Sequence, residues 1–327
     1  MFKALRTIPV IFDIIRDMEE LCPNAWLINF TNPVGIVSEA VLRYTSWQRY
    51  VGLCNCPISM RFGIARWMGV DPARIRMELS GLNHHFFVTD VFIDGKSCFD
   101  EVLDRYCELP VEELGTMKNI MAIPWSSALV RGLRAVPVSY LNYYFSTREE
   151  LAQLMADYRT HGVRAEVVKQ VEAELFELYR DPELHEKPKR LEERGGAHYS
   201  DAACSLIDST VNDRGDIQYV DVRNGGAVSS LPAESAIECA AMITADGPKP
   251  RAVGELSPAI NGTIQTIKSF ERLVAEAAVT GNRDLLVAAL VANPLCDSDA
   301  VANAVIDELL EAHRAYLPQF YAEGHGA

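Results

Sequence analysis

The sequence predicts an α/β fold, in which an incomplete parallel sheet is followed by a larger α+β part. Two short apolar runs, residues 25–30 and 49–54, are each followed at once by a helical pattern. This alternation is typical of parallel βαβ units. Residues 74–97 instead alternate apolar and polar positions around a turn, which indicates strands of a different kind.

The first expected element is a helix. Apolar side chains recur at helical spacing over residues 1–21, and Pro23 follows the point where this pattern stops. Two further helices are predicted over residues 35–44 and 58–69, directly after the two apolar runs. Strands and helices therefore alternate through the first part of the chain.

The second part is mainly helical. Residues 140–180 and 260–318 carry long amphipathic patterns, and residues 216–246 have strand character. We place a domain boundary after residue 90, which gives a first domain over residues 1–90 and a second over residues 91–327.

The composition of the 327 residues, 49% hydrophobic and 23% charged, predicts a soluble globular protein with sizeable cores. No run approaches the roughly 18 apolar residues of a membrane span, and aspartates interrupt the N-terminal segment where a signal peptide is apolar. The eight cysteines are scattered, so we expect reduced thiols and a cytoplasmic protein. The net charge of −14 argues against nonspecific binding to nucleic acid.

Two motifs lie where the predicted parallel strands end. VGLCNCP ends a buried strand with a thiol, Cys54, and FTNPVG places Asn32 after the preceding strand. Ligands bind at this edge of open α/β sheets. A buried structural cysteine and an Asn-Pro turn that stops a strand are the alternative interpretations. We interpret Cys56 as a packing residue, because the proline that follows it should turn the chain.

GLNHH places His84 at the end of the predicted strand over residues 74–82, on the same sheet edge as Cys54. Thiolate and imidazole suit a divalent first-row transition metal, and two protein ligands leave positions open for substrate oxygens. A purely structural metal is a weaker interpretation, because two ligands do not close a tetrahedral site.

A series of motifs along essentially the whole chain resembles glycoside hydrolase family 4, most closely its 6-phospho-β-glucosidase branch. They are INFTNPVGIVSEAV, VGLCNCPISM, LSGLNHHFFVTDVF, PVSYLNYY, ERGGAHYSDAA and VANPLCDSDAVANAVIDELLEAHRAYLPQF. The resemblance implies hydrolysis of 6-phospho-β-glucosides by oxidation, elimination, addition and reduction, instead of the usual carboxylate pair. In that family NAD⁺ accepts a hydride from C3 of the sugar, a base removes the C2 proton, and a divalent metal, usually Mn²⁺, polarises the carbonyl.

The resemblance also implies roles for particular residues. Cys54 and His84 would hold the metal, and Asn32 would bind sugar hydroxyls close to the cofactor. Asn55 stands where relatives that act on α-linked phosphosugars carry aspartate, so it favours β-linked substrates.

Tyr140 of PVSYLNYY would be the C2 base, and it needs a nearby cation or metal to lower its pKa from about 10. Arg164 would bind the sugar phosphate. An aromatic helix face packed in the core and a surface helix arginine are the respective alternatives.

The family pattern begins with a glycine-rich turn, and no G-x-G-x-x-G occurs in this sequence. We therefore expect residues 1–90 to form the C-terminal portion of a Rossmann-like NAD-binding domain that lacks its N-terminal part, with weak NAD⁺ binding. Residues 91–327 would form a domain for substrate, metal and oligomerisation, resembling the C-terminal domain of lactate and malate dehydrogenases. The expected partners are a phosphosugar glycoside and further copies of the chain, as a homodimer or homotetramer.

Two alternative functions stay open from the sequence. One is a catalytically inactive, truncated remnant of the family. The other is a 2-hydroxy-acid dehydrogenase of the lactate/malate type, which predicts a catalytic histidine in a GxHG setting where this chain has GLNHH.

Overall fold

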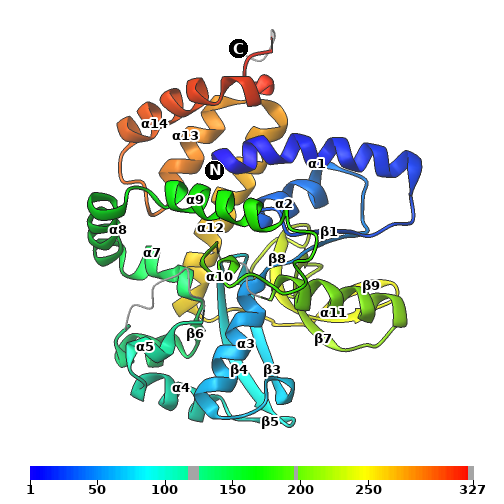
Figure 1. Ribbon diagram of the computed structural model, residues 1–327, viewed down its shortest axis with the longest axis vertical. Helices are drawn as coiled ribbons and strands as arrows, with labels where there is room; N and C mark the ends of the chain where they lie inside the picture. Colours follow the sequence, from blue (N-terminus) through cyan, green and yellow to red (C-terminus); the bar gives the residue numbers. More distant parts are fainter. Residues whose placement is uncertain (117–124, 195–197, 323–327) are drawn as a thin grey trace.

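A nine-stranded mixed sheet organises the computed structural model, which describes residues 1–116, 125–194 and 198–322 (Figure 1). The strand order is β1-β2-β7-β8-β3-β4-β5, with β6 paired to β4 and β9 paired to β8. The strands are β1 (Leu27–Asn29), β2 (Tyr50–Gly52), β3 (Ile75–Leu82), β4 (His85–Ile93), β5 (Lys96–Ser97), β6 (Val136–Pro137), β7 (Ile217–Arg223), β8 (Ala236–Thr244) and β9 (Gly247–Pro250).

Within the described residues, the parallel part of the sheet consists of β1 and β2 alone, and Asn29 pairs with Gly52 at its end. β2 continues into the antiparallel part through a pairing of Gly52 with Asp221 of β7. The expected incomplete parallel sheet is therefore joined directly to the strands of the second part. The boundary that we placed after residue 90 falls within β4.

The helices confirm the expected order of elements. The N-terminal helix that the sequence predicts is α1, and the helices after the two apolar runs are α2 and α3. The bounds of the helices are α1 (Phe2–Leu21), α2 (Val34–Tyr44), α3 (Asn55–Met68), α4 (Phe99–Glu108), α5 (Val111–Leu114), α6 (Ser127–Leu133), α7 (Asn142–Phe145), α8 (Thr147–His161), α9 (Arg164–Leu178), α10 (Leu191–Arg194), α11 (Tyr199–Asn212), α12 (Pro258–Thr280), α13 (Arg283–Ala292) and α14 (Asp299–Ala312).

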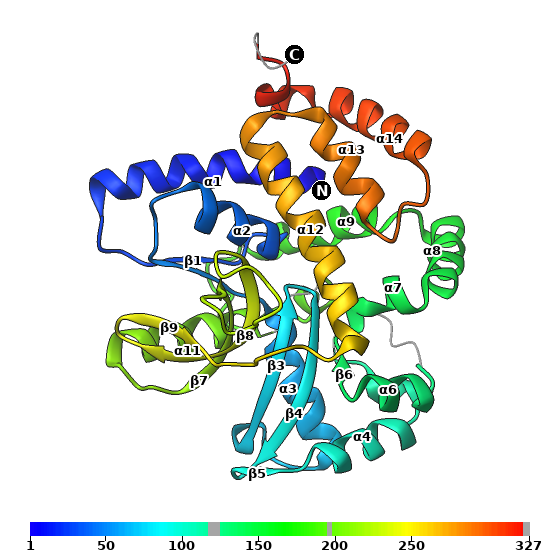
Figure 2. The same ribbon diagram turned by 180° about the vertical axis from the view of Figure 1, so that it is seen from behind.

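Helices cover both faces of the sheet. α3 lies against one face of β3 and β4, and α12 crosses the opposite face, as the two opposed views show (Figures 1 and 2). One hydrophobic core joins the sheet to α3, α4 and α6. A second core lies among α1, α2 and α12–α14, where α1 contributes Leu5, Ile8 and Ile15 at helical spacing.

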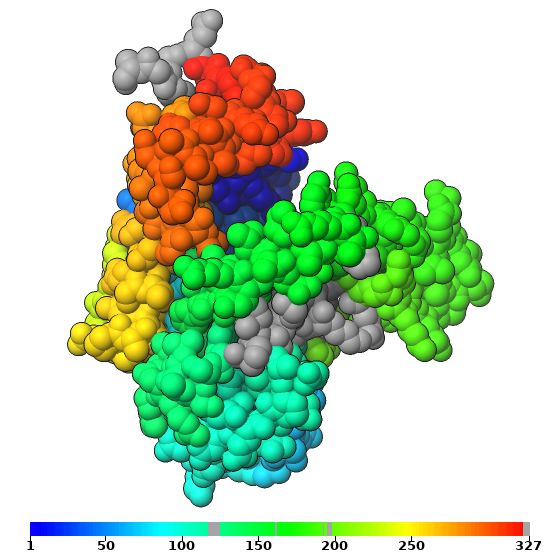
Figure 3. Space-filling view, turned by 90° about the vertical axis from the view of Figure 1, so that its left-hand side faces the viewer, coloured from blue at the N-terminus to red at the C-terminus, as the bar shows by residue number. Residues whose placement is uncertain are grey.

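The segment that contains α8 and α9 projects from this body, and it is coloured green in the space-filling view (Figure 3). Its apolar side chains Leu151, Leu154, Met155, Phe176 and Tyr179 are exposed. No helix among the described residues combines the length and the hydropathy that a crossing of a lipid bilayer requires.

A buried ion-pair network joins α2 to α12. Lys268 Nζ donates to Glu39 Oε2 at 3.0 Å and to Glu271 Oε2 at 2.6 Å, and all three side chains are buried. Burial alone would lower the pKa of Lys268, but the two glutamates raise it above its ordinary value. The ammonium group therefore stays charged and pairs with two carboxyl groups that have little access to water.

We predict that Lys268→Met lowers the free energy of unfolding by about 3–5 kcal/mol, because it leaves Glu39 and Glu271 buried without their counter-ion. Urea unfolding at neutral pH measures this loss. Lys249→Met is the matched control, since Lys249 is exposed, and it should change stability by no more than about 0.5 kcal/mol. Equal effects of the two substitutions would show that the network contributes nothing.

Candidate active site

Cys54 lies just beyond the carboxyl end of β2 and is the N-cap of α3. β2 ends at Gly52, where an added Cβ would lie 2.5 Å from Ser38 Oγ and 2.7 Å from Asp221 Cβ, so a side chain there would displace the strand. The Cys56 N–H donates to Cys54 Sγ at 3.5 Å. The start of α3 thus directs an N–H group at the thiol, an arrangement that favours a thiolate.

His84 lies in the two-residue turn between β3 and β4, where Leu82 pairs with His85. Its φ of 62° is in the left-handed region, which a residue other than glycine or asparagine seldom adopts. On the strand before the turn, a Cβ added at Gly81 would lie 2.4 Å from the His85 carbonyl oxygen, so the close approach of the two strands requires glycine there. The tight hairpin therefore holds the imidazole at the tip of the sheet.

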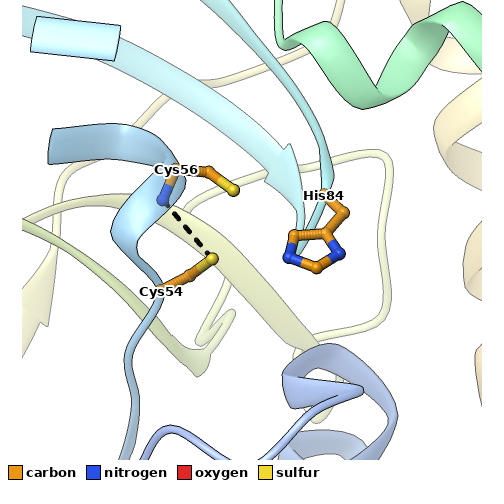
Figure 4. Close-up of side chains that lie close together, drawn as sticks. All are labelled: Cys54, Cys56 and His84. Carbon is orange, nitrogen blue, oxygen red and sulfur yellow. Dashed lines mark hydrogen bonds between the residues drawn. The ribbon is translucent and has the colours of Figure 1, made fainter. Parts of the chain in front are cut away.

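The structure brings these two residues together. Cys54 Sγ, Cys56 Sγ and a ring nitrogen of His84 all lie within 4.8 Å of one another, with both sulfurs on the side of the imidazole (Figure 4). Asn55 is buried beside them, and its Oδ1 accepts from Cys54 Sγ at 3.9 Å. Cys56, which we expected only to pack, is thus part of the cluster.

The charge of the cluster favours a cation. The pKa of Cys54 is held well below its ordinary value, chiefly because the Cys56 thiol donates to its sulfur and then because His84 is close, although burial acts the other way. Donation to Cys54 and burial raise the pKa of Cys56. A buried thiol with a lowered pKa beside an imidazole is a suitable donor set for a divalent first-row metal.

Tyr140 stacks on His84, with ring centroids 4.1 Å apart and planes inclined by 20°. It lies in a 3-10 turn, Ser139–Leu141, is half-buried and packs against the hydrophobic core, as the alternative interpretation expected of its ring. Burial, then Cys56 and Cys54, raise the pKa of Tyr140. A cation bound by the thiols would act in the opposite direction.

Asn32 and Arg164 differ in their surroundings. Asn32 follows β1, whose end is paired with the end of β2, and its Oδ1 is buried without a hydrogen-bond partner among the described residues. An unpaired buried amide oxygen at this edge fits a ligand hydroxyl. Arg164 is exposed at the start of α9, and its guanidinium donates to the Glu193 carbonyl at 2.7 Å.

Tyr199 and His198 lie close to the site, although the sequence analysis assigned them no role. The ring of Tyr199 meets Phe30 at the end of β1, with centroids 5.1 Å apart, and His198 stacks on Phe62 of α3 at 4.5 Å. Burial, followed by Cys54 and Cys56, raises the pKa of Tyr199. His198 and Tyr199 therefore border the cluster, and only their place in the family pattern indicated this.

A buried carboxyl pair behind the cluster was not predicted. Asp221 of β7 and Glu238 of β8 are cross-strand neighbours, and Asn83, next to His84, donates to Glu238 Oε1 at 3.4 Å. Burial, then the charges of Asp221 and Cys54, raise the pKa of Glu238 well above its ordinary value. Burial thus favours the protonated form of Glu238, which donates to Asp221, and the pair links the β7–β8 hairpin to the turn that carries His84.

We predict that Glu238→Gln makes stability less sensitive to pH. The unfolded chain releases the Glu238 proton near pH 4.3, about the ordinary glutamate pKa, whereas the folded chain releases it at a higher pH. The folded state binds more protons, so the free energy of unfolding falls as pH rises above this value. Glutamine retains both hydrogen bonds without a titrating proton, and its thermal midpoint should fall less between about pH 5 and pH 8.

The control for this prediction is Glu255→Gln, which changes an exposed carboxyl. Its thermal midpoint should follow that of the unsubstituted protein across the same pH range. If Glu238→Gln shows an unchanged pH dependence, Glu238 is ionised in the folded state and the shared proton is refuted.

The comparisons with known proteins agree with this geometry. Residues 79–296 match the family model described as Family 4 glycosyl hydrolase C-terminal domain, and residues 1–70 match Family 4 glycosyl hydrolase. The chain belongs to glycoside hydrolase family 4. The expected family is therefore confirmed.

Relatives with named activities extend over nearly the whole chain. It is 51% identical over 321 residues to the "Probable 6-phospho-beta-glucosidase" of Bacillus subtilis (strain 168), covering 98% of this chain and 72% of that protein. It is 46% identical over 323 residues to the 6-phospho-beta-glucosidase of Escherichia coli (strain K12), covering 98% of this chain and 71% of that protein.

A solved structure shares the fold. The 6-phospho-beta glucosidase from Thermotoga maritima, in a form with manganese, NAD+ and glucose-6-phosphate, superposes with a TM-score of 0.84 at 30% identity. The match covers 96% of this family 4 chain and 72% of that one. Malate dehydrogenase from Cryptosporidium parvum matches at a TM-score of 0.51 and 12% identity, which confirms the expected dehydrogenase-like fold and no more.

Proposed function

We propose that this family 4 protein hydrolyses 6-phospho-β-glucosides with NAD⁺ and a divalent metal. The observation that carries the proposal is the convergence of Cys54 and His84 at the sheet edge, beside the stacked ring of Tyr140. Relatives named for this activity, with 51% and 46% identity, support the substrate class. The dehydrogenase alternative has only a likeness of fold in its favour.

The residues of the cluster fit a metal. A buried thiol with a lowered pKa and an imidazole offer two donors, and Asn32 Oδ1 is a buried acceptor without a partner among the described residues. When bound, NAD⁺ supplies a hydride acceptor, and the divalent cation polarises the sugar oxygens. Asn32 would orient the sugar hydroxyls at this edge, and Asn55 would contact the sugar beside Cys54.

Tyr140 would hold and move the proton of the sugar C2. Its stacking on His84 fixes the ring beside the metal donors, so its phenol oxygen would face the same ligand. Arg164, exposed at the start of α9, would bind the 6-phosphate with its guanidinium group. Asn32, Asn55, Tyr140 and Arg164 would only bind and orient the substrate and move a proton. The proposed reaction requires no carboxylate pair.

The experiment is cleavage of p-nitrophenyl 6-phospho-β-glucoside by the whole chain, with saturating NAD⁺ and Mn²⁺. We expect release of nitrophenol that requires both additions, and much slower release from the 6-phospho-α-glucoside and from the unphosphorylated β-glucoside. A preference for the unphosphorylated or α-linked substrate would contradict the proposed substrate class.

Binding provides a second readout in the same experiment. Calorimetric titration with glucose 6-phosphate should show binding that strengthens when Mn²⁺ is present. Binding without cleavage at any NAD⁺ concentration would support the inactive family member that the sequence left open. A titration with NAD⁺ alone measures the affinity for the cofactor in the absence of sugar and metal.

The cellular setting and the assembly belong to the same proposal. All eight cysteines are free, two of them exposed, which supports the reducing cytoplasm as the compartment. The exposed apolar side chains of α8 and α9 support a homodimer or homotetramer. Light scattering after size-exclusion chromatography measures the mass in solution, and a monomer at micromolar concentration would contradict the assembly.

A further inference from the structure

Cys56 lies within the metal cluster, although the family resemblance gives it no role. Its sulfur, that of Cys54 and a ring nitrogen of His84 lie within 4.8 Å of one another. In a tetrahedral site with metal–sulfur bonds of about 2.3 Å, two sulfurs lie about 3.8 Å apart. The three donor atoms therefore need to move by no more than about 1 Å to close around one cation.

The surroundings of the three donors favour this closure. The two cysteines are 4% and 2% exposed, so their sulfurs have little access to water, whereas His84 is half-buried. Figure 4 shows both sulfurs directed from the start of α3 toward the imidazole, with no other labelled side chain between them. A cation held by these three atoms would keep one coordination position open for a sugar oxygen.

We propose that Cys56 is a third metal ligand, so that this chain holds its cation with two sulfurs and one nitrogen. The inference rests on the proposed function, because it concerns the same cation. Two sulfurs, one imidazole and one open position form a donor set that suits catalytic Zn²⁺. Sulfur donors favour Zn²⁺, Co²⁺ and Fe²⁺, whereas Mn²⁺ prefers oxygen ligands.

The consequence is a shift in metal preference that depends on one residue. With Cys54 and His84 alone, the open positions would be filled by water and sugar oxygens, which suits Mn²⁺. The sulfur of Cys56 would replace one of those oxygens, and the resulting ligand set would favour softer cations such as Zn²⁺. Cys56 is thus the residue that determines which cation this protein selects.

The test is X-ray absorption at the zinc edge on the whole chain loaded with one equivalent of Zn²⁺ in the presence of a phosphine reductant. We expect two sulfur neighbours at about 2.3 Å and at least one nitrogen neighbour. Cys56→Ser should show a single sulfur, with an affinity for Zn²⁺ that is lower by at least about tenfold and a smaller change for Mn²⁺. Cys239→Ala removes another buried thiol, outside the cluster, and should keep two sulfurs.

The outcomes separate this inference from the function on which it rests. One sulfur at the metal of the unsubstituted protein, unchanged by Cys56→Ser, overturns the third ligand and leaves Cys54 and His84 as the metal donors. No bound Zn²⁺ or Mn²⁺ in the unsubstituted protein overturns both proposals. Because the sulfur count of the unsubstituted protein decides the question, the test does not depend on the folding of any variant.

Discussion

Cys54→Ser should abolish metal-dependent cleavage of 6-phospho-β-glucosides. Serine keeps the N-cap of α3, because a hydroxyl accepts from the first N–H groups as well as sulfur does. It removes the sulfur anion that the cluster presents to a cation. Loss of a residue that only hydrogen-bonds to a metal ligand already lowers metal affinity by about 10–100-fold. Loss of the ligand itself should lower the Mn²⁺ affinity by at least as much.

The measurement is the electron paramagnetic resonance signal of free Mn²⁺ during titration, combined with initial rates of nitrophenol release. Cys239→Ala is the control for loss of a buried thiol elsewhere, and its Mn²⁺ affinity should equal that of the unsubstituted protein. His84→Asn removes the other donor while keeping a residue that tolerates the φ of 62°. If Cys54→Ser binds Mn²⁺ normally, Cys54 is a structural residue and the site lies elsewhere.

Tyr140→Phe should lower kcat by about 10²–10⁴-fold, the usual contribution of a general base. Phenylalanine keeps the ring that stacks on His84 at 4.1 Å and removes only the phenol oxygen. The Mn²⁺ affinity and the KM should therefore change little. Initial rates over a range of substrate concentrations separate the two constants.

Tyr143→Phe provides the matched control, because its ring neighbours that of Tyr140 with centroids 6.5 Å apart. This variant should retain most of the activity. An equal loss of kcat in both variants would point to a packing effect. A rise in KM with unchanged kcat in Tyr140→Phe would show that the phenol binds the substrate and moves no proton.

The sequence was sufficient for the order of elements and for the meeting of Cys54 with His84. α1 follows directly from apolar spacing, and β1, α2, β2 and α3 follow from strand and helix patterns that alternate. The carboxyl ends of neighbouring strands share one edge, and this rule predicted that Asn32 and Cys54 follow strands that end at the same edge of the sheet. The hairpin that carries His84 followed from the alternation around GLNHH.

Other features depend on pairing between residues far apart in the sequence, which a local sequence pattern does not predict. The sheet is continuous because Gly52 pairs with Asp221, 169 positions later by their residue numbers. The same pairing buries Asp221 and Glu238 behind the His84 turn. Buried carboxyls in a strand pattern resemble ordinary outward-facing residues, so no local pattern indicated a shared proton.

Cys56 is buried in the core as expected, but the local conformation differs from the one that we expected. We treated residues 54–57 as extended chain that Pro57 turns aside, but Cys54 is an N-cap and Cys56 is the second residue of α3. Pro57 is compatible with the first turn of a helix. Helical Cα–Cβ bonds tilt toward the N-terminus, which directs the Cys56 sulfur back over Cys54.

The most direct test of the account is a crystal structure of the whole chain with Mn²⁺ and glucose 6-phosphate, analysed by anomalous scattering at the manganese edge. We predict one strong peak within bonding distance of both Cys54 Sγ and a ring nitrogen of His84, in contact with hydroxyl oxygens of the sugar. A manganese peak that touches neither residue, or a sugar bound away from the peak, would contradict the claim that this sheet edge is the catalytic centre.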